Sequence, residues 1–526
     1  MQFEPSPATS VSVSSPVNSS NSSSDSFVPN PVSPANLSSG STNSPAPIQA
    51  KIASIQTDVL NLQVNLQDGN INQAELLLYP ESLSDKSPVK LLYQSLDGEY
   101  LAQSGLLSTD LGSLIFHTNT PSVQLKPGQN QVELVLNAAS HGILIHKIYT
   151  LHRGSYQVSV SYVIENHSGK PWQGNLYGQV VRTPPNAGDN LYTKIATFVG
   201  GVISTPEKRY ETLSFKNIAE NPPAETLAQG GWVAMVQHYF ITAWIPNAQT
   251  QNQFYAKAYD QNNFGVGSIS PSITIPPGQA QTVGGRFYIG PTLTRQLNAT
   301  APYLSLTIDY GWLFFIAKYL FLVLRFIHNL VGNWGWSIVI ITLLLKALFF
   351  PLSHKSYSSM AKMRVLQPKM KALQEAHQGD RQGLQKAIME LYTKEGVNPL
   401  GGCLPILIQI PIFIALYWML MASVELRQAP FIFWIQDLSV HDPYYVLPIL
   451  TGVLMLSQQL LSPKPADKIQ MYVMMSMPIV FTLFMMRLPA GLGLYMVVNI
   501  GISILQQYLI TRSTQKQVLE KARHHR

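Results

Sequence analysis

The chain has 526 residues, of which 46% are hydrophobic and only 12% are charged, and its formal net charge is +7. Soluble globular proteins carry about 25% charged residues, so this composition favours a membrane protein. Much of the basic excess lies between or after apolar runs, and no nucleic-acid-binding fold signature accompanies it, which argues against a nucleic-acid-binding protein. The single cysteine, Cys403, excludes an internal disulfide.

Residues 1–48 are rich in Ser, Pro and Asn and have few charges. Such a segment buries too little apolar surface to offset the entropy of ordering, so we expect a disordered tether. The first ten residues, "MQFEPSPATS", lack both a basic segment and an apolar core. They therefore do not form a secretory signal peptide.

Residues 49–305 predict an all-β domain. Runs that alternate polar and apolar residues, such as "QVELVLNA" and "YQVSVSYVIEN", are separated by turn signals such as "KPGQN" and "NHSGKP". This spacing is typical of a sandwich of two sheets. The region shows no metal-ligand spacing, nucleophile motif or phosphate-binding loop, so we predict a structural or binding role. We predict no catalytic residue, metal site or cofactor for the chain.

Residues 306–333 contain a predicted amphipathic helix. Lys318, Arg325 and His328 share one face at helical spacing, and Phe, Leu and Ile cover the remainder. This pattern suits a helix lying in the membrane interface. A helix packed on the β sandwich is the alternative.

Residues 334–511 form a predicted membrane core with five apolar spans. Each is close to the length that crosses a hydrocarbon layer of about 30 Å. The spans are 337–352, 401–423, 444–461, 470–486 and 491–511.

The basic residues predict the orientation of these spans. Residues 353–400 carry eight Lys and Arg, the tail 512–526 carries five, and the loop 424–443 carries only Arg427. Basic loops stay in the cytoplasm, so we expect the first two segments inside and the β domain outside.

Residues 353–400 also have the pattern of two amphipathic helices, which predicts a cytoplasmic helical hairpin. It is either a docking arm for a ribosome or nascent chain, or a solvated clasp without a partner.

Lys346 lies within the first apolar span. It shares a helical face with Thr342, and none of the other four spans contains Asp or Glu, so an ion pair inside the membrane is not expected. Two interpretations remain open. Lys346 either extends toward the cytoplasmic interface, or faces a water-filled cavity between helices. Polar residues of the other spans that could line such a cavity are Gln409, Thr482, Asn499, Ser503 and Gln506.

Three stretches of the helical region carry a family resemblance: "GNWGWSIVIITLLLKALFFPLSHKSYSSMAKMRVLQPKM", "DPYYVLPIL" and "LPAGLGLYMVVN". They resemble the bacterial YidC membrane protein insertases, which are related to the mitochondrial Oxa-type proteins. The resemblance is dense over about 310–511, and the β region resembles, more loosely, the large periplasmic domain of Gram-negative members. It implies a polytopic α-helical inner-membrane protein with a five-helix core, an all-β supersandwich periplasmic domain and a cytoplasmic C-terminus.

The resemblance also implies a mechanism and partners. The helices would form a positively charged hydrophilic groove, open to the cytoplasm and to lipid and closed to the outside. The polar segment of a nascent membrane protein enters this groove, and its apolar segment slides into the bilayer. The family acts as insertase and folding chaperone, alone or with the Sec translocon. Ribosomes or targeting factors would bind the hairpin 353–400 and the basic tail.

The resemblance assigns individual residues to the groove. Lys346 falls where the family usually has an arginine, Thr342 matches the groove threonine, and Tyr495 matches a tyrosine of the last span. Met496 stands where a second tyrosine is common, which weakens a polar contact there. The polar residues Gln409, Asn499 and Ser503 complete the expected groove.

Two alternatives to an insertase remain open from the sequence. One is a small-solute transporter or channel with an anion site at Lys346, although the chain shows no inverted repeat. The other is an assembly chaperone that binds the translocon and inserts nothing. Gram-negative members of the family begin with a membrane anchor that this sequence does not show. We therefore expect Met1 to be an internal or truncated start, which N-terminal sequencing of the native protein would test.

Overall fold

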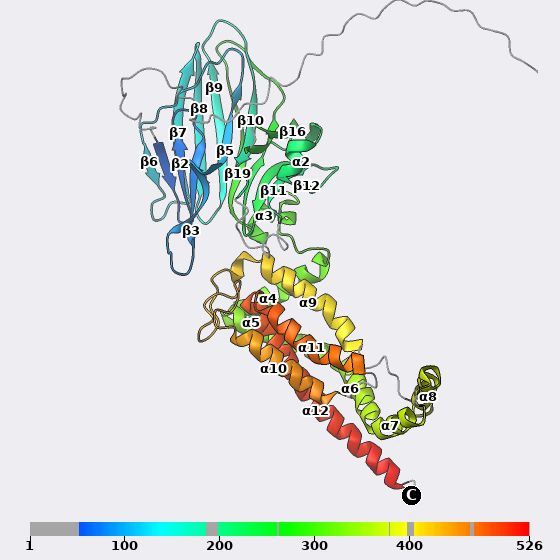
Figure 1. Ribbon diagram of the computed structural model, residues 1–526. Coiled ribbons are helices and arrows are strands. Elements are labelled where there is room, and N and C mark those ends of the chain that lie inside the picture. Colours follow the sequence, from blue (N-terminus) through cyan, green and yellow to red (C-terminus); the bar gives the residue numbers. More distant parts are fainter. Residues whose placement is uncertain are drawn as a thin grey trace, which may run out of the picture. The chain divides into compact units, whose positions relative to one another are not determined.

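The computed structural model describes residues 52–185, 198–259, 262–377, 379–396, 404–462 and 468–524. The predicted tether 1–48 lies outside the described residues. Two parts follow in chain order, a β domain and a helical region (Figure 1).

The β domain consists of two large sheets, which confirms the all-β prediction. The first sheet has eleven strands in the order β13-β16-β17-β10-β5-β4-β3-β2-β1-β6, with β18 paired to β10. Its strands are β1 (Ile52–Gln56), β2 (Leu60–Asn65), β3 (Ile71–Pro80), β4 (Pro88–Ser95), β5 (Gly98–Leu107), β6 (Ser122–Gln124), β10 (Trp172–Arg182), β13 (Thr226–Gln229), β16 (Gln251–Ala258), β17 (Phe264–Ile269) and β18 (Ile273–Ile275).

The second sheet has eight strands in the order β12-β11-β14-β15-β19-β9-β8-β7. Its strands are β7 (Gln131–Ser140), β8 (Ile143–His152), β9 (Gln157–Asn166), β11 (Gly200–Ser204), β12 (Glu211–Leu213), β14 (Trp232–Gln237), β15 (Phe240–Ile245) and β19 (Ala280–Pro291). Short helices α2 (Phe215–Glu220) and α3 (Thr294–Thr300) and the 3-10 turn η2 (Leu304–Thr307) complete the domain.

Alternation of side chains explains how these strands bury a common core. Along β9, buried and partly exposed residues alternate without interruption, as a half-buried strand requires. Large aromatic residues fill the space between the sheets, among them Trp172, Trp232 and Trp244. Gly178 on β10 lets the indole of Trp244 approach, since a Cβ at this position would lie 2.0 Å from Trp244 Cε2.

A lysine is buried in this core. Lys147 on β8 has no exposed surface, and its Nζ donates to the carbonyl oxygen of Ser104 on β5 at 2.8 Å. The rings of Phe116, Tyr149 and Tyr162 lie 5.2–5.9 Å from the same nitrogen. Burial lowers the pKa of Lys147 to about 7, and the charge of Asp68 acts in the opposite direction. The hydrogen bond of Lys147 therefore joins the two sheets, while burial of its ammonium group costs free energy.

The helical region has a break inside the first predicted span, and the described part of 353–400 lies in three helices where the sequence predicts two. Its elements are α4 (Phe314–Val331), α5 (Trp334–Leu348), α6 (Phe350–Val365), α7 (Gln367–Ala376), α8 (Arg381–Lys394), α9 (Leu404–Ala422), the 3-10 turn η4 (Val424–Leu426), α10 (Val446–Leu461), α11 (Lys468–Met485) and α12 (Ala490–His524). The pair α5 and α6 bends by 66° at Phe349. Pro351 lies in the first turn of α6 and has no N–H to continue the α5 hydrogen bonds.

By length and composition, α4 and α12 can each cross a membrane, as can α5 with α6 if the bent pair is one span. Shorter apolar stretches occur in α9, α10 and α11, at Leu407–Ala422, Val446–Leu461 and Met471–Met485. The arrangement with five spans and an interfacial α4 stays a prediction. Helix α12 continues beyond the predicted end of its span at 511, so the described part of the basic tail is helical.

The contact between Gly178 and Trp244 generates a first prediction. Gly178→Ala should destabilise the β domain by about 1–3 kcal/mol, because the new methyl group forces the indole or the strand to move. Thermal unfolding of the full chain in detergent measures this as a lower midpoint of the β-domain transition. Gly169→Ala is the matched control, because no atom lies within 4 Å of its added Cβ. Equal midpoints for the two variants would contradict this packing.

The buried lysine generates a second prediction. The folded-state pKa of Lys147 is depressed, so the unfolded chain binds more protons between pH 7 and 10.5, and stability rises with pH in that window. Compared with Lys147→Met, the free energy of unfolding of the unsubstituted chain should rise more steeply, by up to about 1.4 kcal/mol per pH unit from 7.5 to 9.5. Denaturant unfolding at several pH values measures both slopes. Parallel pH profiles would show that Lys147 does not titrate in this range.

Candidate functional site

Helix α5 carries the expected groove residues Thr342 and Lys346 of the first span. The Asn333 side chain caps its N-terminus by accepting from the backbone N–H of Trp336 at 3.1 Å. Gly335 follows the cap, and a Cβ there would lie 2.0 Å from Phe431 Cδ2. The absence of a side chain therefore lets the Phe431 ring pack against the first turn of α5.

Lys346 lies in the last turn of α5 and contacts α12. Its Nζ donates to Ser503 Oγ at 2.6 Å, and the Ser503 hydroxyl donates to the carbonyl of Asn499 at 2.7 Å. Ser503 and Asn499 are 4% and 5% exposed. Lys346 forms no ion pair with any carboxylate that the structure describes. The ammonium group is therefore directed into the helix bundle, toward a neutral hydroxyl.

A second polar pair joins α9 to α12. Gln409 Nε2 donates to the Tyr495 hydroxyl at 3.5 Å, and the Tyr495 ring lies 6.5 Å from the ring of Phe413. Tyr495 precedes Ser503 by eight residues, a rise of about 12 Å along the helix. The structure thus places two polar contacts on α12, separated by about two turns.

Thr342, Met496 and Thr482 do not hydrogen-bond to these pairs. Thr342 is 1% exposed and its hydroxyl donates to Ile338 O of its own helix at 2.6 Å. Met496 is 9% exposed and belongs to the core of the helical region. Thr482 likewise donates to its own helix, to Pro478 O at 2.7 Å. Of the expected set, the structure joins Lys346 to Ser503 and Gln409 to Tyr495.

Two polar residues that the sequence analysis did not identify, Gln507 of α12 and Gln459 of α10, make contacts with neighbouring helices. Gln507 is 1% exposed and its Nε2 donates to Ser462 Oγ, at the end of α10, at 3.3 Å. Gln459 donates to Met474 O of α11 at 2.6 Å. Gln507 follows Ser503 by four residues, so helical periodicity from Asn499 and Ser503 could have identified it.

An apolar hollow lies between α4 and α5, beside the span that carries Lys346. The hollow is lined by Phe315, Ile316, Tyr319, Leu320, Val323, Ile341, Leu344, Leu345 and Leu348. Every lining residue is aliphatic or aromatic. The same helix therefore offers a polar contact to α12 and an apolar surface to α4.

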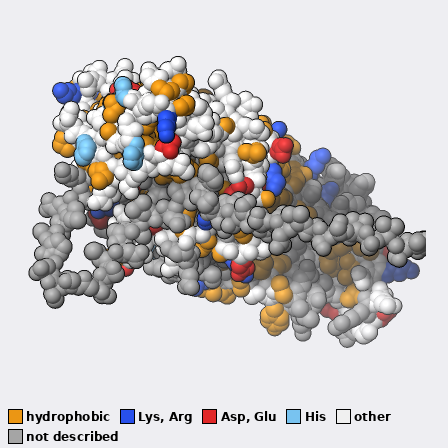
Figure 2. Space-filling view, turned by 90° about the horizontal axis from the view of Figure 1, so that it is seen from above, with side chains coloured by type: hydrophobic (Ala, Val, Ile, Leu, Met, Phe, Trp, Pro, Cys, Tyr) orange, Lys and Arg blue, Asp and Glu red, His pale blue; other side chains and the backbone are white. Residues whose placement is uncertain are grey.

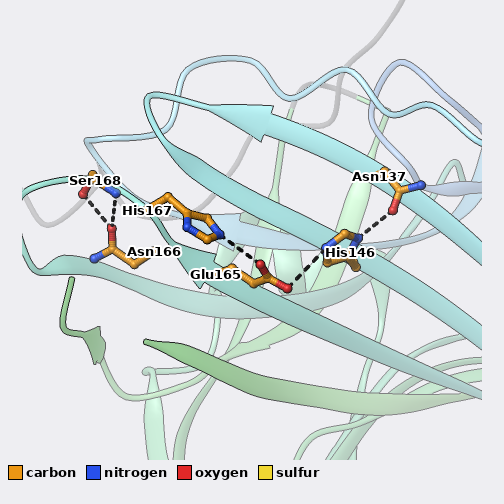
Figure 3. A network of polar contacts seen from close by, with 6 residues as sticks. All are labelled: Asn137, His146, Glu165, Asn166, His167 and Ser168. Carbon is orange, nitrogen blue, oxygen red and sulfur yellow. Dashed lines mark hydrogen bonds and ion pairs between the residues drawn. The ribbon is translucent and has the colours of Figure 1, made fainter. Parts of the chain in front are cut away.

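The β domain carries a separate polar cluster on the outer face of its second sheet (Figure 3). Glu165 lies between two imidazoles, with its oxygens 3.7 Å from His146 Nε2 and 3.0 Å from His167 Nε2. His146 Nδ1 and Asn137 Oδ1 are 2.6 Å apart. Figure 2 shows histidines together with apolar side chains on the face seen from the β-domain end. Among the described residues, no group of three His, Cys, Asp or Glu could hold a metal ion. The contacts of Asn137, His146 and Glu165 join the strands β7, β8 and β9.

Comparison with known families accounts for nearly the whole described chain. The family described as "YidC periplasmic domain" matches residues 52–323, and the family described as "60Kd inner membrane protein" matches residues 326–517. The first match coincides with the β domain and the start of α4, and the second with the helical region.

Individual relatives match over most of their length. The "Membrane protein insertase YidC" of Pseudomonas fluorescens (strain SBW25) is 43% identical over 93% of this chain and 90% of its own. The protein of the same name from Nitrosococcus oceani is 45% identical over 89% of this chain and 86% of its own. A solved structure described as an active YidC insertase covers 86% of this chain and 92% of its own, with 18% identity and a TM-score of 0.39. The two family matches and the identity to these relatives show that the chain belongs to the YidC membrane protein insertase family.

Proposed function

We propose that this chain inserts client polypeptides into the inner membrane through a polar groove between α5, α9 and α12, in which Lys346 attracts the client. The observation that supports this most strongly is the hydrogen bonding of Lys346. An ammonium has three N–H donors, and one is used by Ser503. No other described residue accepts from Lys346, so the remaining donors require water or an acceptor on a client.

The distribution of basic residues supports an orientation for the groove. The segment that contains α7 and α8, and the end of α12, carry most of the Lys and Arg of the helical region, which favours the cytoplasmic side. Lys346 lies near the α6 end of α5, close to this basic side. The β domain then lies in the periplasm and the C-terminus in the cytoplasm.

Two physical effects drive insertion in this proposal. A polar client segment loses hydration when it enters hydrocarbon, and a cation in a water-containing groove reduces that cost for acidic segments. The apolar client segment gains about 25 cal/mol for each Å² that it removes from water as it moves into lipid. Partitioning supplies the free energy, so no catalytic residue, cofactor or nucleotide is assigned.

The expected groove residues have distinct roles in this proposal. Ser503 accepts from the ammonium of Lys346, and the backbone carbonyl of residue 499 accepts from the Ser503 hydroxyl. Gln409 and Tyr495 provide a second polar contact, deeper in the bundle. Thr342 and Met496 shape the wall of the groove without donating to its polar pairs.

The proposed partners follow from this activity. The clients are nascent inner-membrane proteins, delivered alone or from the Sec translocon. The helices α7 and α8, with the basic end of α12, form the proposed contact for ribosomes or targeting factors. The apolar hollow between α4 and α5 faces lipid or the apolar segment of a client.

A reconstitution experiment tests the proposed activity. We expect the purified chain in lipid vesicles to protect the translocated segment of a small single- or double-spanning client from added protease, without other proteins. Partitioning needs no further energy source, so the protection should not depend on nucleotide. Solute flux without insertion would instead identify a transporter, and client binding without protection would identify a chaperone.

Substitution of Lys346 tests the electrostatic part of the proposal. Lys346→Glu should lower insertion of clients with acidic translocated segments by about ten-fold, equivalent to about 1.4 kcal/mol, and should affect neutral clients less. Lys346→Arg retains the charge and should stay close to the unsubstituted chain. The measurement is the protease-protected fraction for paired clients that differ only in charge. Equal activity of the Glu and Arg variants on acidic clients would contradict electrostatic attraction.

A further inference from the structure

The loop between α9 and α10 turns its apolar side chains outward and its carboxylates inward. Residues 431–445, which we call the aromatic loop, have the sequence "FIFWIQDLSVHDPYY". Phe433 is 80% exposed and Tyr444 is 69% exposed. Asp437 and Asp442 are the only Asp, Glu, Lys or Arg in this stretch of sequence, and they are 8% and 1% exposed. Surface loops in water usually expose their carboxylates, so this loop has the inverse distribution.

Both carboxylates find their donors within the protein. Asp442 Oδ1 accepts from Trp434 Nε1 at 2.9 Å and from the backbone N–H of Tyr444 at 3.1 Å. Asp442 Oδ2 accepts from a backbone N–H in the first turn of α10 at 2.8 Å, where a negative charge is favourable. Asp437 Oδ1 accepts from the backbone N–H and the hydroxyl of Ser439 at 2.8 and 2.7 Å. The outer surface of the aromatic loop is therefore left without an exposed carboxylate.

Contacts with three helices place the aromatic loop at one end of the helical region. The Val440 carbonyl accepts from the backbone N–H of Ala490, the first residue of α12, at 2.7 Å. The Phe431 ring packs against Gly335 and lies 5.4 Å from the ring of Trp336, in the first turn of α5. By length and composition, α12 can cross a membrane. The loop therefore lies where α5, α10 and α12 begin, at the level of a membrane surface.

The backbone of the aromatic loop holds its rings in a conformation that large side chains rarely adopt. Phe433 and Tyr445 have φ angles of 53° and 56°, in the left-handed region. Such a backbone persists only where surrounding contacts determine it, and here the hydrogen bonds to Asp442 and to the start of α12 do so. The Phe433 ring also stacks on Trp434, at 6.0 Å between ring centroids. The outward direction of these rings is therefore built into the fold.

The exposed surface of the loop matches the interface of a lipid bilayer. Aromatic side chains are enriched at the headgroup level, where an apolar ring and a polar hydroxyl such as that of Tyr444 are both accommodated. The surface continues onto the first turns of α10, where Val446, Ile449 and Leu450 are exposed. These residues belong to an apolar helix of the predicted membrane core. This continuity favours lipid over a protein partner as the occupant.

We propose that the aromatic loop inserts Phe433 and Tyr444 into the headgroup and acyl boundary of the leaflet at this end of the helical region. Because the loop contacts the first turns of α5, α10 and α12, this insertion fixes the depth at which the three helices enter the membrane. In the orientation proposed above, the leaflet is the periplasmic one. The inference adds a lipid contact that requires neither the groove nor Lys346.

Spin-label accessibility in lipid vesicles tests this contact. The full chain with Cys403→Ala carries a nitroxide at Phe433→Cys or at Tyr444→Cys, in vesicles of phosphatidylethanolamine and phosphatidylglycerol without other proteins. We expect both labels to be more accessible to oxygen than to a water-soluble nickel complex, at a depth of about 5–10 Å in the boundary region. Leu96→Cys, at a fully exposed leucine between β4 and β5, is the aqueous control and should show the reverse. Accessibility at 433 and 444 equal to that at 96 would overturn the inference and leave this surface to a protein partner.

A pair of substitutions separates insertion of the loop from insertion of the apolar label itself. With the label at Tyr444→Cys, Phe433→Glu should shift the label toward water and out of this depth range, because an ionised carboxylate is costly to place in the acyl boundary. Phe433→Leu keeps an apolar side chain and should leave the depth unchanged. Equal depths for the two variants would mean that the label alone enters the lipid, which would also overturn the inference. If the inference fails while the purified chain still inserts clients, the insertase proposal stands.

Discussion

The hydrogen bond from Lys346 to Ser503 is the interaction on which the account of this protein depends. A cation within a membrane-spanning helix costs free energy, less so toward the interface, and Ser503 accepts from only one of the three N–H groups of this ammonium. The structure directs the ammonium toward α12 and pairs it with no described carboxylate. The proposed insertase mechanism requires that water reaches this ammonium group, so it depends on a hydrated region beside α12.

The polar and apolar sides of the helical region have complementary roles. One side of α5 contacts α12 through the hydrogen bond from Lys346 to Ser503, and the other side contributes to an apolar hollow with α4. In the proposed mechanism, a client that is polar in one segment and apolar in the next contacts both surfaces at once. The β domain contributes two packed sheets, whose core accommodates a buried lysine because three aromatic rings and a backbone carbonyl surround it.

Much of the fold followed from the sequence because its periodicities are strong. Alternating runs such as "YQVSVSYVIEN" predicted strands, and the apolar runs predicted the helices of the core. The bend at Phe349 was missed, because the apolar run continues through it and only Pro351 marks the break. The role of Lys147 could not be predicted, since its burial depends on a carbonyl and rings from distant strands.

At the candidate site, Lys346 and Thr342 were recognisable from their spacing, whereas the pairing of Lys346 with Ser503 required the packing of α5 on α12. The hydrogen bonds of Gln459 and Gln507 depend on the packing of α10, α11 and α12, which no sequence pattern encodes.

Water access at position 346 is the most direct test of whether Lys346 lies in a hydrated groove. In vesicles that contain a chain lacking Cys403, Lys346→Cys should react with a charged, membrane-impermeant thiol reagent. Leu344→Cys, at a side chain that is 52% exposed on the same helix, should remain unreactive because it faces lipid. Reaction at 346 but not at 344 is the result that a hydrated groove predicts. Protection of both positions would place Lys346 in a dry environment and contradict the mechanism.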